Sequence, residues 1–274
     1  MSLTRERLQD IQQNGYQLDF GNVFNHAFEN YKKIALYAGL ILFVFTFVFF
    51  AVFTMSFGHY FASIGMENIN KQLIENLEQQ KNLETPILLM GFGILILSLL
   101  LTPFSAGFYK MSDRADKDQE FKFSSMFSFY KAPYFLNIII ATILIALFNM
   151  VISTTVISLL NMASIKSIVL IQLTSYLISF LVFLFTFLTI PLIIFGNLKA
   201  LEAIKHSILI VSKHPFILIG LLIVAFIGSI LGIMGCCIGI FFTLPFLYSM
   251  NYAIYHAIVG INTENETKDT VTDL

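Results

Sequence analysis

The feature that most constrains the fold is the length of the charge-free runs in the sequence. From His214 to Thr263 no Asp, Glu, Lys or Arg occurs, which leaves 50 residues without a charge. As one helix this run would be about 75 Å long, more than twice the hydrocarbon thickness of a membrane, about 30 Å. The run must therefore fold back on itself, and we place a tight hairpin at Gly235–Gly239, where the sequence reads GCCIG.

Other runs indicate four more membrane helices. Ile34–Phe57 and Pro86–Tyr109 contain no charge, and between Ala132 and Leu198 the only charge is Lys166, in the turn-like NMASIKS. In lipid every backbone polar group needs an internal partner, and the runs are far longer than barrel strands, so they predict helices. The six predicted spans are 34–57, 86–109, 134–161, 168–196, 215–234 and 239–259.

The composition supports an all-α polytopic membrane protein. Hydrophobic residues make up 57% of the chain and charged residues 12%, against about 25% charged residues in soluble domains. Because a soluble domain buries only about three quarters of its unfolded surface, this composition excludes a soluble enzyme, a disordered chain and a disulfide-stapled secreted domain. We expect 1–33 to be a cytoplasmic amphipathic segment, 34–259 the membrane domain and 260–274 a disordered acidic cytoplasmic tail.

The basic residues predict the orientation. With six spans, 13 of the 16 lysines and arginines fall on one side, and the other side holds Lys71, Lys81 and Lys166. Cytoplasmic loops carry the excess of Lys and Arg, so both termini are expected in the cytoplasm. The basic balance on that side suits anionic lipid headgroups. The mixed signs and the net charge of −1 argue against nucleic acid as a partner.

The chain resembles three copies of one unit, a helical hairpin preceded by an amphipathic juxtamembrane helix. In each amphipathic stretch apolar residues recur at i, i+4 and i+7 with a basic residue at the edge, a pattern typical of a helix in the headgroup region. The three sets are Phe24, Phe28 and Tyr31; Phe123, Phe127 and Tyr130; and Ile204, Ile208 and Val211.

The second helix of each predicted hairpin contains a proline next to or near a threonine: Pro103, Pro191 and Pro245. A proline inside a helix removes one hydrogen bond and kinks the helix, which neighbouring helices and Thr hydroxyls make tolerable in membranes. We expect three kinks at equivalent depth, which would splay the cytoplasmic ends of these helices. Because proline is frequent in membrane helices, the kinks alone do not establish a repeat.

The hydropathy, the amphipathic stretches and the helix-embedded prolines resemble those of uncharacterised six-helix bacterial integral membrane proteins. This type is related to the membrane domain of some glycerophosphodiester phosphodiesterases. The resemblance covers about residues 20–262 and implies a multi-pass protein of the bacterial inner membrane. It supplies no catalytic residues that transfer to this chain.

The sequence contains no catalytic, cofactor or metal motif, so we expect no enzyme activity, cofactor or metal site. The five histidines include no pair at i, i+3 or i, i+4, and Glu202 with His206 is the only carboxylate–imidazole pair at i, i+4. Alone, this pair lacks the three or four ligands of a zinc site. A membrane enzyme would have to gather residues such as Glu202, His206 and His214 at one membrane face.

Two further groups allow alternative interpretations. Cys236 and Cys237 are adjacent in the predicted outer hairpin. They either pack as small residues in a tight turn, form a vicinal disulfide or bind a soft metal. Four acidic residues in the second loop suggest a site for a divalent cation. They alternate with basic residues, however, and this pattern favours a solvated, self-neutralising loop. The four are Asp113, Asp116, Asp118 and Glu120.

Small and polar residues suggest how the helices associate. Gly228, Gly232, Gly235 and Gly239 form a seam that allows close backbone approach, either within the bundle or between chains. No Asp, Glu, Lys or Arg lies within a predicted span, and His256 lies at the cytoplasmic end of the last one, which argues against a charged-substrate site. The mildly polar residues either bond between helices or line a cavity. The candidate cavity-lining residues are Asn149, Gln172, Asn197 and Asn251.

The favoured hypothesis from the sequence is a non-enzymatic integral inner-membrane protein with a scaffolding, assembly or accessory role in the cell envelope or a membrane complex. Its partners would be membrane lipids and other envelope proteins, contacted through the outer loop 58–85 or the glycine seam. In that loop Met66, Ile69, Leu73 and Leu77 predict an amphipathic helix. The alternative is a transporter or lipid-handling protein with a weakly polar cavity between the proline-kinked helices.

Overall fold

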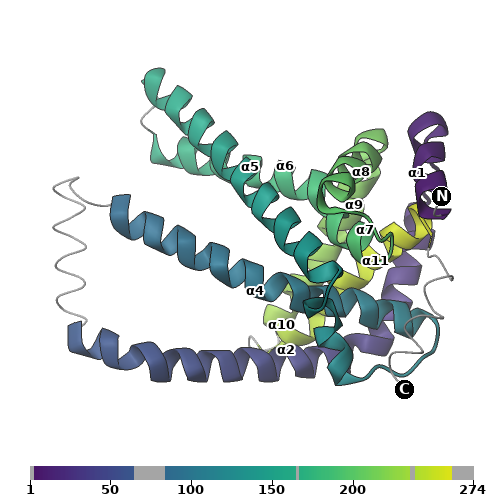
Figure 1. Ribbon diagram of the computed structural model, residues 1–274, viewed down its shortest axis with the longest axis horizontal. Helices are drawn as coiled ribbons and strands as arrows, with labels where there is room; N and C mark the ends of the chain where they lie inside the picture. Colours follow the sequence, from purple (N-terminus) through teal and green to yellow (C-terminus); the bar gives the residue numbers. More distant parts are fainter. Residues whose placement is uncertain (1–2, 65–83, 165–166, 235–237, 261–274) are drawn as a thin grey trace.

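The computed structural model describes residues 3–64, 84–164, 167–234 and 238–260, and this part of the chain is helical without a strand (Figure 1). The longer helices are α1 (Leu3–Asn14), α2 (Phe20–Ile64), α4 (Glu84–Asp116), α5 (Tyr134–Met162), α6 (Ile168–Thr186), α8 (Ala200–Lys213), α9 (Pro215–Ile230) and α11 (Pro245–Ile258). The shorter ones are η1 (Phe123–Tyr130), α7 (Thr189–Ile194), η2 (Leu231–Met234) and α10 (Gly239–Thr243).

Five stretches are long and apolar enough to cross a membrane, so the structure has the character of a polytopic membrane protein: 20–52, 95–116, 134–162, 168–194 and 215–234. The sixth predicted span, 239–259, corresponds to α10 and α11, and neither is long enough by itself. The chain turns at Leu244, and α11 starts with Pro245, whose missing N–H suits the first position of a helix. Six spans therefore stay a prediction.

The three prolines that were predicted to kink helices at equivalent depth occupy different local settings. Pro103 lies inside the continuous helix α4. Pro191 lies in α7, after α6 has ended at Thr186. Pro245 begins α11. The helix is interrupted before the second and third prolines, so only the first lies within a continuous helix.

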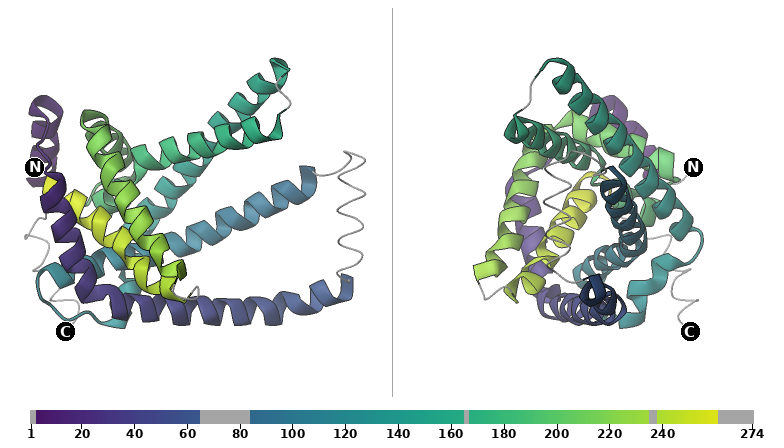
Figure 2. Two further views of the ribbon diagram at one scale, coloured as in Figure 1. Left: turned by 180° about the vertical axis from the view of Figure 1, so that it is seen from behind. Right: turned by 90° about the vertical axis from the view of Figure 1, so that its left-hand side faces the viewer.

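The helices pack at one end and separate toward the other. Figures 1 and 2 show α2, α4 and the α5–α6 hairpin diverging from a common region that contains α7, α8 and α11. Fully buried residues gather at this packed end, for example Leu192, Ile210 and Tyr252. Away from it large apolar side chains are exposed, with Phe47 at 67% and Met162 at 80%. Lipid tails satisfy such side chains as well as a neighbouring helix does.

The three predicted amphipathic stretches form the start of α2, η1 and α8. The second is a 3₁₀-helix and not the expected α-helix. It is only eight residues long, in keeping with the short lengths of this tighter helix, and the Ser128 hydroxyl donates to the Ser125 carbonyl at 2.7 Å. A 3₁₀-helix brings residues three apart onto one face, which here places Met126 and Phe129 in the core.

Each amphipathic stretch buries the face one residue before its predicted apolar stripe. The middle stripe residues Phe28, Phe127 and Ile208 remain 42%, 41% and 42% exposed. This arrangement leaves the middle residue of each stripe available to the membrane while the adjacent face packs on protein. The buried residues are Ala27, Met126 and Ser207 at 0% exposure, followed by Asn30 at 2%, Phe129 at 5% and Ile210 at 0%.

The same buried positions connect each stretch to the hairpin that precedes it. The Ser207 hydroxyl of α8 donates to the Phe185 carbonyl of α6 at 2.8 Å. Met126 of η1 lies against Gly107 of α4, where a Cβ would come within 2.8 Å of the Met126 Cα. The Ser249 hydroxyl of α11 donates to the Ala27 carbonyl of α2 at 2.8 Å, so the first stretch packs on the last hairpin and closes a ring.

The glycine seam packs within the chain. A Cβ on Gly228 would lie 2.7 Å from the Phe246 ring, and Gly232 and Gly239 approach each other so closely that a Cβ on either would meet the other's backbone. Small residues thus bring α9 and η2 against α10 and α11, which answers the question of an internal or external seam for three of the four glycines. Gly235 lies outside the described residues.

Three other expectations also fall outside the described residues. They are the amphipathic helix predicted from Met66 to Leu77, the pair Cys236 and Cys237, and the tail from residue 261 onward. They stay predictions.

The N-terminal segment divides into two helices, because Gly15 adopts a positive φ of 76° and ends α1. Leu8 and Ile11 of α1 are fully buried. At its rim the Arg5 guanidinium donates two hydrogen bonds to Glu202 of α8, at 3.0 and 3.1 Å. These contacts dock α1 on the packed end.

The burial of Leu8 should contribute most of the free energy that holds α1 on the packed end. We expect Leu8→Ala to cost about 2–5 kcal/mol, because it removes a buried apolar side chain and leaves a cavity. Tryptic cleavage at Arg5 and Arg7 of the detergent-solubilised protein should accelerate by at least about tenfold as α1 opens. Glu202→Gln should accelerate it far less, since the exposed ion pair is screened by solvent. Equal acceleration by both variants would contradict this assignment.

The glycine seam makes a second prediction. Gly232→Ala should destabilise the protein by about 1–3 kcal/mol, because its methyl group must displace the Gly239 backbone. Gly93→Ala is the matched control, since Gly93 is also helical but a Cβ there would meet nothing within 4 Å. Thermal unfolding in detergent should show a lower midpoint for Gly232→Ala and an equal or higher one for Gly93→Ala.

Candidate functional site

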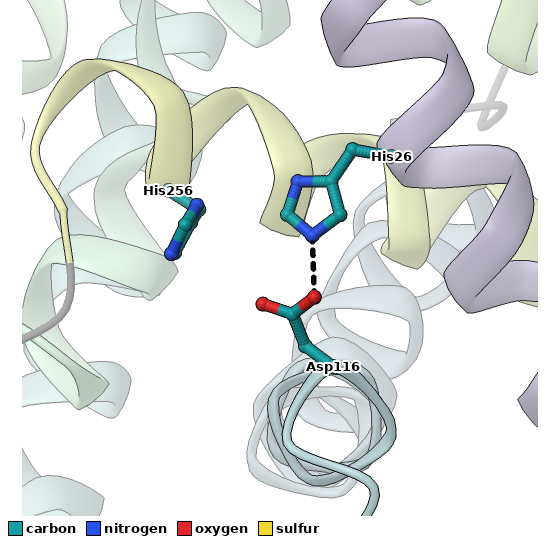
Figure 3. A group of neighbouring side chains, drawn as sticks. All are labelled: His26, Asp116 and His256. Carbon is teal, nitrogen blue, oxygen red and sulfur yellow. Dashed lines mark hydrogen bonds and ion pairs between the residues drawn. The ribbon is translucent and has the colours of Figure 1, made fainter.

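The packed end brings together two histidines and an aspartate from three distant helices (Figure 3). His26 lies near the start of α2, Asp116 is the last residue of α4, and His256 lies near the end of α11. The His26 Nε2 and Asp116 Oδ1 atoms form a hydrogen bond of 2.7 Å. One candidate ligand atom from each of the three residues lies within 4.8 Å of the others.

The position of each residue follows from the helix packing. His26 precedes Ala27, whose carbonyl accepts the Ser249 hydroxyl bond, so the contact between α2 and α11 fixes His26 beside α11. The His26 and His256 rings meet edge to face, with centroids 5.1 Å apart. Asp116 reaches them because α4 runs past its predicted end at Tyr109 for another seven residues.

Tyr252 supports this cluster from α11. Its hydroxyl lies 3.0 Å from Asp116 Oδ2 and 3.2 Å from Asp113 Oδ1. It has a single proton and donates to one carboxylate at a time. The Tyr252 ring also stacks on His256, with an interplanar angle of 26°. Tyr252 therefore orients both Asp116 and His256.

The neighbouring acidic residues have basic partners. Asp113 forms an ion pair of 3.2 Å with Lys117, and Asp118 one of 2.6 Å with Lys33. The interpretation as a self-neutralising loop fits Asp113, whose partner lies in the same segment, whereas Asp118 pairs with a lysine of α2. Asp116 differs, because its carboxylate turns toward the histidines.

The cluster was not predicted from the sequence, and no metal site was expected. Ligand pairs that the sequence can indicate lie within one helix, whereas the cluster takes one residue from each of three helices. The available signal was the set of histidines at the predicted cytoplasmic boundary together with the acidic residues that follow the second span. Local spacing alone does not select His26 and His256 from the five histidines.

The residues named for a membrane enzyme do not form a comparable group. Glu202 bonds Arg5, which holds the pKa of that carboxyl below its usual range. A depressed carboxyl pKa stabilises the fold above the unfolded value of about 4.3, so the ion pair is intact at neutral pH and is lost in acid. Burial lowers the pKa of His206. His214 packs edge-on against Tyr16, with ring centroids 5.0 Å apart.

The four predicted cavity-lining residues lie apart. Asn251 is 3% exposed and donates to the Tyr109 hydroxyl at 3.3 Å. Asn149 faces Ser179 across the α5–α6 hairpin at 3.5 Å. Gln172 is exposed on α6, and Asn197 is exposed before α8 with a positive φ of 52°. None of the four lines the apolar groove between α5, α6 and α8 or the one between α2, α9 and α11.

An apolar groove of about 600 Å³ lies between α5, α6 and α8. Its one polar lining residue, Thr186, donates its hydroxyl to the Val182 carbonyl at 2.6 Å and offers no free donor. The groove therefore suits an apolar occupant. Its lining consists of Leu144, Ile145, Phe148 and Ile152 of α5; Ile178, Leu181, Val182, Phe185 and Thr186 of α6; and Leu201, Ile204 and Ile208 of α8.

A second apolar groove, of about 420 Å³, lies where the start of α2 meets α9 and α11. Phe24 and Phe28 line it, and these are the first two stripe residues of the first amphipathic stretch. Their counterparts in the third stretch, Ile204 and Ile208, line the larger groove. In the second stretch the counterpart Phe127 packs near Phe104, with ring centroids 5.9 Å apart.

Comparison with known proteins gives no relative: no protein-family model, no curated protein and no solved structure matches the chain. The resemblance to six-helix bacterial membrane proteins stays a prediction, and function must be argued from the geometry.

Proposed function

We propose that the protein is a non-enzymatic integral membrane protein of the bacterial inner membrane that holds the acyl chain of a membrane lipid. The observation that carries the proposal is the apolar groove between α5, α6 and α8. Its volume of about 600 Å³ falls within the range of ligand pockets, about 300–1,000 Å³.

The position of α8 supports a lipid as the occupant. Leu201, Ile204 and Ile208 face the groove, and Lys205 is exposed on the same helix. An amphipathic helix with this division lies in the headgroup region, where lysines attract anionic lipids by about 1 kcal/mol each. The groove would then take the chain of a lipid whose headgroup lies beside α8.

The apolar groove favours the lipid-handling alternative over the scaffolding role that was preferred from the sequence. The candidate site also differs in place and chemistry from the predicted cavity. The sequence suggested a weakly polar cavity lined by asparagine and glutamine, whereas the groove is apolar and lies between a hairpin and an amphipathic helix.

A bulky substitution in the groove tests the proposal. Native mass spectrometry of the protein released from mild detergent should detect phospholipid bound to the wild type, because a lipid held in a groove resists removal. Ile178→Trp should reduce the lipid-bound fraction at least about tenfold, since the indole fills the groove.

Leu177→Trp is the matched control. Leu177 is adjacent on α6 but is 57% exposed and does not line the groove. It should bind lipid as the wild type does. Equal lipid binding by the two variants would refute the groove as the binding site.

The scaffolding role remains a second candidate, and the separation of the helices away from the packed end favours it (Figure 2). The apolar sides of α2 and α5 there would accept a membrane helix of another protein as well as lipid. The same spectra distinguish the two functions, because a scaffold would carry a second polypeptide at a fixed ratio.

We also propose six spans in a threefold repeat with both termini cytoplasmic. The equivalent buried positions Ala27, Met126 and Ser207 support the repeat. The basic residues Lys33, Lys117 and Lys213 belong to the packed end or its loops, which supports a cytoplasmic packed end.

Single-cysteine labelling tests the orientation. In a background where Cys236 and Cys237 are serine, a membrane-impermeant maleimide should label Asn70→Cys in intact cells. Gln119→Cys, the control on the predicted cytoplasmic side, should be labelled only after lysis. The opposite result would reverse the orientation, because 13 of 16 basic residues would then lie outside.

A further inference from the structure

We propose that His26, Asp116 and His256 bind a divalent transition-metal ion, for which zinc is the probe. The chemistry of the donors supports this choice. Two imidazoles and one carboxylate form a nitrogen–oxygen set that suits zinc, iron or nickel and differs from the all-oxygen sites of calcium and magnesium. Three protein ligands with a fourth position for water is the pattern of open zinc sites.

The distances permit an ion with small movements of the side chains. With zinc–ligand bonds of about 2.1 Å, tetrahedral ligand atoms lie about 3.3–3.4 Å apart. The His26–Asp116 hydrogen bond, at 2.7 Å, is shorter than this, and the ligand atoms of the cluster all lie within 4.8 Å. An ion would replace the proton between His26 and Asp116 and draw His256 inward.

His256 distinguishes a metal site from an ion pair between His26 and Asp116. Within the described residues its ring contacts His26 and Tyr252 but forms no hydrogen bond. An ion pair between His26 and Asp116 does not need His256, whereas a three-ligand metal site does. His256 lies beside both residues (Figure 3).

Tyr252 supplies the outer shell that metal sites use to orient their ligands. Its hydroxyl bond to Asp116 Oδ2 leaves Oδ1 facing His26. Loss of such a partner commonly weakens metal binding about 10–100-fold. The side chains of His26 and Asp116 are each about one-quarter exposed, so an ion can reach them from solvent.

The test is zinc titration of the full chain in detergent, purified with a tag that contains no histidine and stripped with a chelator. The wild type should bind one zinc ion per chain. His256→Ala and Asp116→Asn should each weaken binding at least about 100-fold, and Tyr252→Phe about tenfold. His214→Ala, which removes a histidine with no part in the cluster, should bind zinc as the wild type does.

Two readouts on the wild type keep the test decisive if a variant fails to fold. Zinc should raise the thermal unfolding midpoint, since it binds only the folded chain. It should also slow modification of His26 and His256 by diethyl pyrocarbonate and leave His214 unaffected. Wild type that binds no zinc, zinc binding that survives His256→Ala, or unchanged modification rates would each overturn the proposal.

Discussion

The fold depends on the contact between each amphipathic stretch and the end of a neighbouring hairpin. Inside a membrane, apolar helices gain little by leaving lipid for one another, because lipid tails are as apolar as leucine. At the packed end polar groups, backbone carbonyls and partly hydrated side chains are available. There the bonds from Ser207 to Phe185 and from Ser249 to Ala27 tie separate hairpins together.

This constraint explains why the two ends of the structure differ. Residues such as Ile210 and Tyr252 are fully buried where the amphipathic stretches meet the hairpins. Further away, the helices diverge, and no comparable polar contact is described between α2 and the α5–α6 hairpin. Both apolar grooves lie at the transition, beside amphipathic stretches that hold one face on protein and leave another toward lipid.

Features set by local chemistry were predictable from the sequence. The charge-free run Tyr134–Met162 forms one helix, because no alternative satisfies its backbone in lipid. Gly228 and Gly232 mark a close helix contact, although the sequence left its partner open. The apolar stripes at i, i+4 and i+7 located the amphipathic stretches, but the face beside each stripe is the one that is buried. The sequence does not distinguish the two faces, because an apolar face can pack either on protein or on lipid.

The candidate sites were not predictable, because they depend on which hairpins touch. His26 and His256 are 230 positions apart, and their encounter follows from the closure of the ring between α2 and α11. The groove beside α8 combines three helices whose residues read only as membrane-facing in the sequence.

The continuity of α2 has a mechanical consequence. One helix of 45 residues contains both His26, at the packed end, and the first membrane span. From Lys33 to Ile64 it extends about 48 Å, so a rotation of about 5° at its base displaces the far end by about 4 Å. A change of tilt at the histidine cluster would therefore displace the far end of α2 by several ångströms, because the helix is continuous between the two.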